Sequence, residues 1–300
     1  MKPIDRRHFL KASLAGAAAV SLAAQSSKTN AAPGLIDTNI NLFDWPFRAL
    51  KYRDTRALVA KLKKHHIIEA WAGSFEALFA KDMNGVNERL ARECHEKGRG
   101  FLIPFGSVNL AWPDWQEDVR RCHEVFKMPG LRIYPGYQPF DLSHADMEAL
   151  VKMTSERGLI LQIVFGMEDP RVHHPIINVG PVTFRPLLKA LAAAPNAKIQ
   201  LLHFAGTNQA DLDQFLSHPN TFLEISRLEG NGAIGRMLGT VQGLPSPRAP
   251  LDRIAFGSHA PFFPVETAIL KLIESPLETA QLRAITQDNA SRFRPRVTLF

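Results

Sequence analysis

Motifs of several well-known protein classes are missing from this chain, and cysteine is scarce. Only 2 of the 300 residues are cysteine. The sequence holds no Cys-x-x-Cys pair, no Gly-x-Ser-x-Gly turn and no glycine-rich phosphate loop. Zinc-finger, serine-hydrolase and nucleotide-binding functions therefore have no support.

Long apolar runs and dense basic stripes are missing as well. Beyond the N-terminus, no stretch approaches the roughly 20 apolar residues that span a bilayer. Four of the seven net positive charges lie in residues 1–32, so only three belong to the remaining 268. That balance lacks the basic footprint of a nucleic-acid-binding protein. With 45% hydrophobic and 22% charged residues, the chain fits a globular protein with a large core, and we expect a small-molecule partner.

The N-terminus resembles a twin-arginine export signal. Residues 5–11 read Asp-Arg-Arg-His-Phe-Leu-Lys, and the apolar stretch 12–24 follows. Its 13 residues are too few for a transmembrane helix. We expect the twin-arginine machinery to export the chain to the periplasm or beyond, with cleavage between 24 and 32 and no stable membrane insertion. An oxidising compartment permits a bridge between Cys94 and Cys122, but buried thiols are equally ordinary.

After residue 32, short apolar segments alternate with amphipathic ones. The predicted strands are 35–41, 67–72, 101–107, 131–134, 159–164, 198–203, 221–225 and 254–257. The predicted helices include 54–65, 114–127, 145–157 and 184–194, with one or two more after Pro264. Eight βα units in roughly 250 residues predict an α/β fold, a single-domain (β/α)8 TIM barrel over 33–300. A doubly wound open sheet is the alternative.

Five segments then indicate a family. They are Ile-Asp-Thr-Asn-Ile-Asn at 36–41, Trp-Pro-Phe-Arg at 45–48, Gly-Leu-Arg-Ile-Tyr-Pro at 130–135, Leu-His-Phe-Ala-Gly at 202–206 and Phe-Gly-Ser-His-Ala-Pro at 256–261. Together they resemble the amidohydrolase-related TIM-barrel proteins of the metal-dependent hydrolase superfamily. The resemblance covers essentially the whole chain after the export signal.

The resemblance implies a divalent metal held by His-x-His on the first strand, histidines on the fifth and sixth, and an aspartate on the eighth. This sequence has Asn39 and Asn41 at the first pair, Gln162 on the fifth strand and His259 for the aspartate; only His203 matches. Amide oxygens are weak zinc ligands. We therefore expect no cofactor and a degenerate or absent metal site, with zinc as the alternative.

The predicted site lies where barrel enzymes keep it, at the carboxyl ends of the strands. His203 and His259 are the predicted acid–base residues, because imidazoles titrate near neutral pH. The predicted substrate-binding residues are Asn39, Asn41, Arg48, Arg132, Gln162 and Arg171. We expect a hydrolase that cleaves a C–N or C–O bond of a small polar substrate. A non-catalytic ligand-binding barrel and a decarboxylase or other lyase are the alternatives, and a homo-oligomer is left open.

Overall fold

Eight parallel strands form the centre of the molecule, in the order β1 to β8. The computed structural model describes residues 34–204, 206–241 and 248–294; the predicted export signal lies outside them. Backbone hydrogen bonds from Thr38 and Asn41 to the segment after β8 join the two edges. The predicted (β/α)8 barrel is confirmed. Its strands are Leu35–Leu42, Ile67–Ser74, Leu102–Gly106, Gly130–Ile133, Ile160–Val164, Lys198–Leu202, Thr221–Glu224 and Ile254–Ala255.

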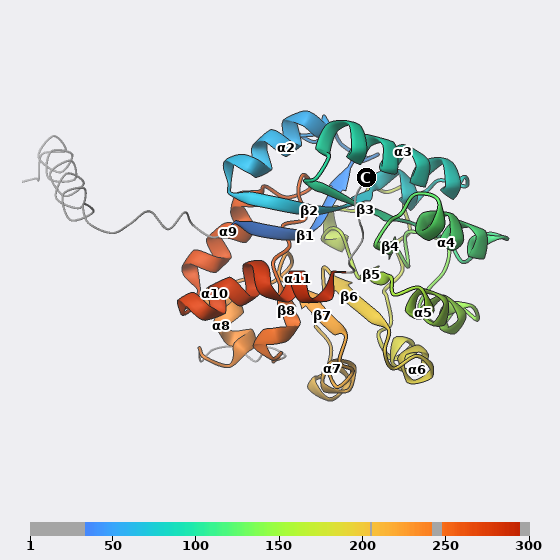
Figure 1. Cartoon of the computed structure of the whole chain (residues 1–300). Helices are drawn as coiled ribbons and strands as arrows, with labels where there is room; N and C mark the ends of the chain where they lie inside the picture. The colour runs from blue at the N-terminus through green and yellow to red at the C-terminus, as the bar shows by residue number, and fades with distance from the viewer. Residues whose placement is uncertain (1–33, 205, 242–247, 295–300) are drawn as a thin grey trace, which may run out of the picture. The chain divides into compact units, whose positions relative to one another are not determined.

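Helices surround the barrel and connect its strands (Figure 1). Helix α2 illustrates why these segments are helical. Asp54 caps it by accepting a hydrogen bond from the Ala57 amide, and the Leu58, Val59 and Leu62 side chains form its buried face. The helices are α2 Thr55–Lys64, α3 Met83–Gly98, α4 Trp115–Glu124, α5 Met147–Glu156, α6 Arg185–Ala193, α7 Gln209–Leu216, α8 Ala233–Leu238, α9 Val265–Glu274, α10 Thr279–Arg283 and α11 Asn289–Phe293.

Aromatic side chains fill the barrel interior toward the amino ends of the strands. Trp71 stacks on Phe105, with 5.1 Å between ring centroids. Phe222 stacks on Phe293 of α11 at 4.0 Å. All four side chains are buried, so this part of the barrel is a packed core.

Both cysteines are buried and free. Burial raises the pKa of the Cys94 and Cys122 thiols, so they remain protonated at neutral pH. In the described parts of the chain, none of the helices combines the length and apolarity that crossing a bilayer requires.

Candidate active site

A chain of hydrogen bonds crosses the middle of the barrel. Arg132 Nε donates to Gln162 Oε1 at 2.8 Å, and Gln162 Nε2 donates to Gln200 Oε1 at 2.7 Å. Gln200 Nε2 then donates to Thr38 Oγ1 at 2.8 Å. All four residues are fully buried. They form a polar layer between the aromatic core and the carboxyl ends of the strands.

Arg132 holds this layer to the neighbouring strands. Its Nη1 donates to the Ile40 carbonyl at 2.7 Å and to Asn41 Oδ1 at 2.9 Å, and its Nη2 donates to the Trp71 carbonyl at 3.3 Å. Gly73 makes room, since a Cβ there would lie 2.7 Å from Nη1. Burial lowers the pKa of Arg132, yet a guanidinium stays charged in proteins. A positive charge therefore lies inside the barrel.

This layer corrects the predicted positions of Gln162 and Asn41. Gln162 pairs in register with Gln200, three residues before His203, so it lies one layer below the mouth. Asn41 contacts Arg132 and Tyr134, whereas Asn39 contacts His203. The β1–β2 register shifts between Asp37 and Ile40, and the two asparagines have separate sets of partners.

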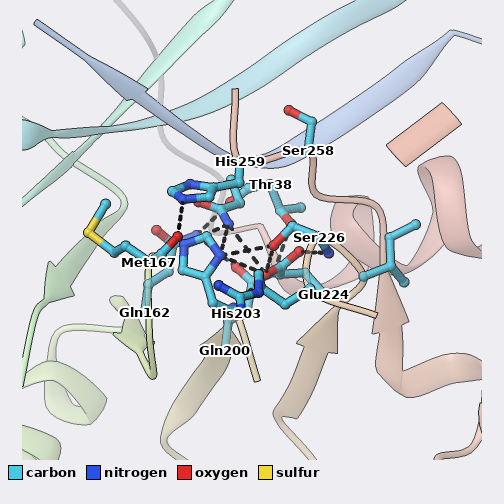
Figure 2. Close-up of polar contacts among 12 residues, drawn as sticks. Thr38, Gln162, Met167, Gln200, His203, Glu224, Ser226, Ser258 and His259 are labelled. Carbon is cyan, nitrogen blue, oxygen red and sulfur yellow. Dashed lines mark hydrogen bonds and ion pairs between the residues drawn. The ribbon is translucent and has the colours of Figure 1, made fainter. Parts of the chain in front are cut away.

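His203 and His259 come together at the mouth. Their ring centroids lie 3.9 Å apart, with 56° between the ring planes. His203 directly follows β6, and His259 follows β8 (Figure 2). Both residues have left-handed backbones, with φ of 56° and 59°. Left-handed backbone is uncommon outside glycine, and such strain concentrates at functional sites.

A relay through Ser226 sets the proton position on His203. Ser226 Oγ donates to Glu224 Oε1 at 2.7 Å and lies 2.9 Å from His203 Nδ1. Because the hydroxyl proton points to Glu224, the oxygen accepts from Nδ1–H. The lone pair of His203 is therefore on Nε2, where Asn39 Nδ2 lies at 3.3 Å. Glu224 also accepts from the His203 backbone amide at 2.6 Å.

His259 provides the second unprotonated imidazole nitrogen of the site. Its Nε2 lies 3.0 Å from the Met167 carbonyl, which can only accept, so Nε2 holds the proton and Nδ1 is bare (Figure 2). Within the described residues, neither His259 Nδ1 nor Asn39 Oδ1 has a hydrogen-bond partner. Burial lowers the pKa of both histidines well below 6.5, and the charges of Arg132 and Arg227 act in the same direction. Both imidazoles are thus neutral at pH 7.

Asp37 lies fully buried beneath this pair. Its Oδ1 accepts from the backbone amides of Asn39 at 3.1 Å and Ser258 at 3.0 Å. Burial outweighs these bonds and raises the pKa of Asp37 from 3.8 to about 7. Its second oxygen has no partner among the described residues. Asp37 therefore carries less than a full negative charge at neutral pH.

Aromatic side chains close the mouth from above. Trp45 makes edge contacts with Phe75, Tyr137 and Phe262, with centroid distances of 5.4, 6.3 and 5.0 Å. Phe262 in turn stacks on His259 at 4.6 Å. All of these rings are at most 7% exposed. We call Trp45, Phe75, Tyr137 and Phe262 the aromatic roof; it keeps bulk water away from the imidazoles.

The two predicted loop arginines differ in position. The Arg48 guanidinium lies 4.3 Å from the Phe262 ring centroid and 3.8 Å from Glu168, so Arg48 borders the roof. Arg171 is 88% exposed and forms its ion pair with Asp169, two residues away. Arg48 therefore lies next to the site, whereas Arg171 lies on the surface and pairs with Asp169.

Four residues around the histidines had no role in the sequence prediction. Glu224 and Ser226 stand at the carboxyl end of the seventh strand, a position that marks them as candidates in the sequence, but no catalytic or binding role was assigned to them. Arg227 follows directly, and Asp37 is the second residue of the first-strand motif. Neither residue type carries a distinctive pattern at these positions.

Comparison with known proteins agrees with this architecture. Residues 36–294 match the Amidohydrolase family. The chain belongs to this family. Residues 3–23 match the twin-arginine translocation pathway signal sequence, which confirms the predicted export route to the periplasm or outside. No curated protein sequence matches the chain.

Solved structures of amidohydrolase relatives share the fold at low sequence identity. The 2,6-dihydroxybenzoate decarboxylase from Rhizobium is 16% identical, with a TM-score of 0.64 over 87% of this chain and 98% of that one. The 5-carboxyvanillate decarboxylase from Sphingomonas paucimobilis is 12% identical, with a TM-score of 0.65 over 89% and 100%. A Polaromonas dihydroxybenzoic acid decarboxylase with bound manganese is 15% identical, with a TM-score of 0.67 over 87% and 97%.

The donor set of this family member does not fit such a metal. In the parts of the chain that the structure describes, no group of three or more His, Cys, Asp or Glu side chains could hold an ion. His203 Nε2, His259 Nδ1 and Asn39 Oδ1 are neutral donors, whereas catalytic metals usually have three strong protein ligands. The buried Arg132 charge further disfavours a second cation.

Proposed function

We propose that this protein is an exported lyase that decarboxylates a small hydroxylated aromatic acid without a metal. The observation that carries the proposal is the pair of neutral imidazoles, His203 and His259, with lone pairs in a mouth closed by aromatic rings. Aromatic walls suit a planar substrate, and a water-poor site favours loss of a carboxylate. The decarboxylases among the relatives support the same reaction class.

The proposed step needs only the chain and the substrate. One imidazole lone pair takes the proton of a substrate hydroxyl ortho to the carboxylate, leaving a phenolate. The imidazolium returns this proton to the ring carbon that bears the carboxylate. The carbon–carbon bond then breaks, its electron pair restores the aromatic ring, and CO2 leaves. A low imidazole pKa favours the return step, since it makes the protonated form a stronger acid.

The other predicted residues have supporting roles in this proposal. Asn39 orients the substrate hydroxyl through its unpartnered Oδ1. Asn41, Arg132 and Gln162 support the mouth from the layer below, and Arg48 borders the aromatic roof.

Hydrolysis is the second candidate, because the relay from Glu224 through Ser226 leaves His203 Nε2 able to accept a proton from water. A panel of aryl acids that includes 2,6-dihydroxybenzoate and 5-carboxyvanillate, run beside esters, amides and lactones, separates the two reactions. We expect CO2 release from at least one acid and no hydrolysis. Ester or amide cleavage without CO2 release would contradict the proposal, and binding without turnover would favour a ligand-binding barrel.

Elemental analysis of the dialysed protein tests metal independence. We expect well under one equivalent of manganese, zinc or iron, with CO2 release unchanged by a chelator. Loss of activity on chelation and its recovery with manganese would contradict this part of the proposal.

A further inference from the structure

Arg227 directly follows Ser226 of the relay, just after β7, and lacks a strong hydrogen-bonding partner among the described residues. Its side chain is 16% exposed, and its Nε and Nη1 atoms are buried without a hydrogen-bond partner among the described residues. The ion pair that the described residues give it spans 3.9 Å to Glu229, a side chain that is 79% exposed. Such a pair contributes little. A buried guanidinium without acceptors carries a desolvation cost that a ligand can remove.

The backbone holds Arg227 in place. Lys271 Nζ donates to the Ile225 carbonyl at 3.1 Å and also to the Ser226 carbonyl. Ser226 is fixed further by its hydroxyl bond to Glu224. The Arg227 guanidinium lies 6.0 Å from the Phe263 ring centroid, and that ring packs edge-on against His259 at 5.2 Å. One aromatic ring therefore separates the guanidinium from the imidazole pair.

The other arginines near the mouth are already engaged. Arg171 pairs with Asp169, and Arg48 lies between Glu168 and the Phe262 ring. Arg132 bonds to two backbone carbonyls and two amide side chains. Of these arginines, Arg227 has buried guanidinium nitrogens, Nε and Nη1, without a hydrogen-bond partner among the described residues. A planar guanidinium matches a carboxylate.

We infer that Arg227 determines specificity by binding the substrate carboxylate beside the two imidazoles. One guanidinium with nitrogens left unpartnered by the described residues suits one carboxylate group. This inference rests on the proposed function, since it names the group that holds the acid before CO2 leaves.

Calorimetric binding of benzoate and of uncharged benzamide tests the inference in the mature protein. We expect Arg227→Gln to weaken benzoate binding by about 30-fold or more while changing benzamide binding by less than about 3-fold. Arg171→Gln, the matched control at an exposed arginine, should change neither. Equal benzoate binding by wild type and Arg227→Gln would overturn the inference. So would a wild type that does not prefer benzoate to benzamide, including one that binds neither.

Thermal unfolding of Arg227→Met without ligand separates binding from structural support. An apolar side chain of similar length removes an unpaired buried charge, so we expect Tm to stay or rise. A fall of more than about 5 °C would show a structural role and overturn the inference. Benzoate binding that depends on Arg227, with no CO2 released from any aryl acid, would contradict the proposed function and leave the assignment of Arg227 standing.

Discussion

The imidazoles of His203 and His259 lie 3.9 Å apart, and each is held by its protonated nitrogen so that the other nitrogen stays basic. One ring donates to a serine and the other to a backbone carbonyl. A proton on either ring disfavours a proton on the other, so the pair holds at most one. This is the state that a proton shuttle between two substrate atoms requires.

Replacing either histidine tests the shuttle. We expect His203→Asn and His259→Asn each to lower kcat for decarboxylation by roughly 10²- to 10⁴-fold, the usual contribution of acid–base catalysis. Asparagine tolerates the left-handed backbone at both positions, so the fold should survive. The exposed His95→Asn is the control. Full activity in either variant, with native circular dichroism, would rule out the assigned role.

The pH dependence of kcat/KM gives a second test. Because burial lowers the pKa of both imidazoles well below 6.5, they stay unprotonated from pH 8 down to 6.5. In Asp37→Asn, which removes the neighbouring carboxyl whose pKa is about 7, we expect kcat/KM to be level over that range and to fall only at lower pH, where protonation removes the base. An acidic limb centred at or above 6.5 would contradict a buried, neutral pair.

Asp37→Asn should stabilise the protein at alkaline pH. The pKa of Asp37 is about 7 when folded and 3.8 otherwise, so the folded state binds more protons between these values and loses stability as pH rises. Asparagine removes this cost. We expect the free energy of unfolding to rise by roughly 2–4 kcal/mol at pH 8 and to change little at pH 4. Denaturant titrations at both pH values measure the difference, and a variant less stable at pH 8 would refute the assignment.

Ser226→Ala should break the relay without removing either imidazole. His203 Nδ1 would lose its 2.9 Å contact, and Glu224 would lose one donor. A hydrogen bond to a charged group contributes about 1.5–3 kcal/mol, so we expect kcat to fall by roughly 10- to 100-fold with KM little changed. Ser143→Ala, at an exposed hydroxyl bonded to Asp141, is the control. A change in KM alone would indicate substrate contact instead.

Gly73→Ala should destabilise the barrel interior. The new Cβ would lie 2.7 Å from Arg132 Nη1 and 2.8 Å from Tyr134 Oη, and both side chains are fully buried. We expect a loss of roughly 1–3 kcal/mol in unfolding free energy. Gly166→Ala is the matched control, since its Cβ would meet nothing within 4 Å. Equal stability of the two variants in urea would argue against a tightly packed Arg132.

The sequence predicted the barrel closely because its strands are apolar runs separated by turn residues. All eight strands agree with the structure to within two residues at each end. The meeting of Asn39, His203 and His259 also followed from the sequence, because the carboxyl ends of barrel strands converge.

The sequence could not predict the register of the strands or which charged side chains pair with each other. Which residue of a strand reaches the mouth depends on the stagger between strands. The sequence does not show this stagger, so the prediction put Gln162 at the mouth, whereas the structure has it one layer below. Arg171 looked like an anchor because its loop is rich in charge, but its own neighbour Asp169 neutralises it. Arg227 lies in no motif, and its missing partners are visible only in three dimensions.

Arg132 also bears on how the barrel assembles. From β4 its guanidinium bonds to Ile40 and Asn41 of β1, Trp71 of β2 and Gln162 of β5, groups 30 to 92 residues away along the chain. A partly assembled barrel would bury the charge with only some of these acceptors, at a cost of several kcal/mol. Half-closed intermediates are therefore penalised, and the first five strands should unfold as one cooperative unit, with their amide protons exchanging together.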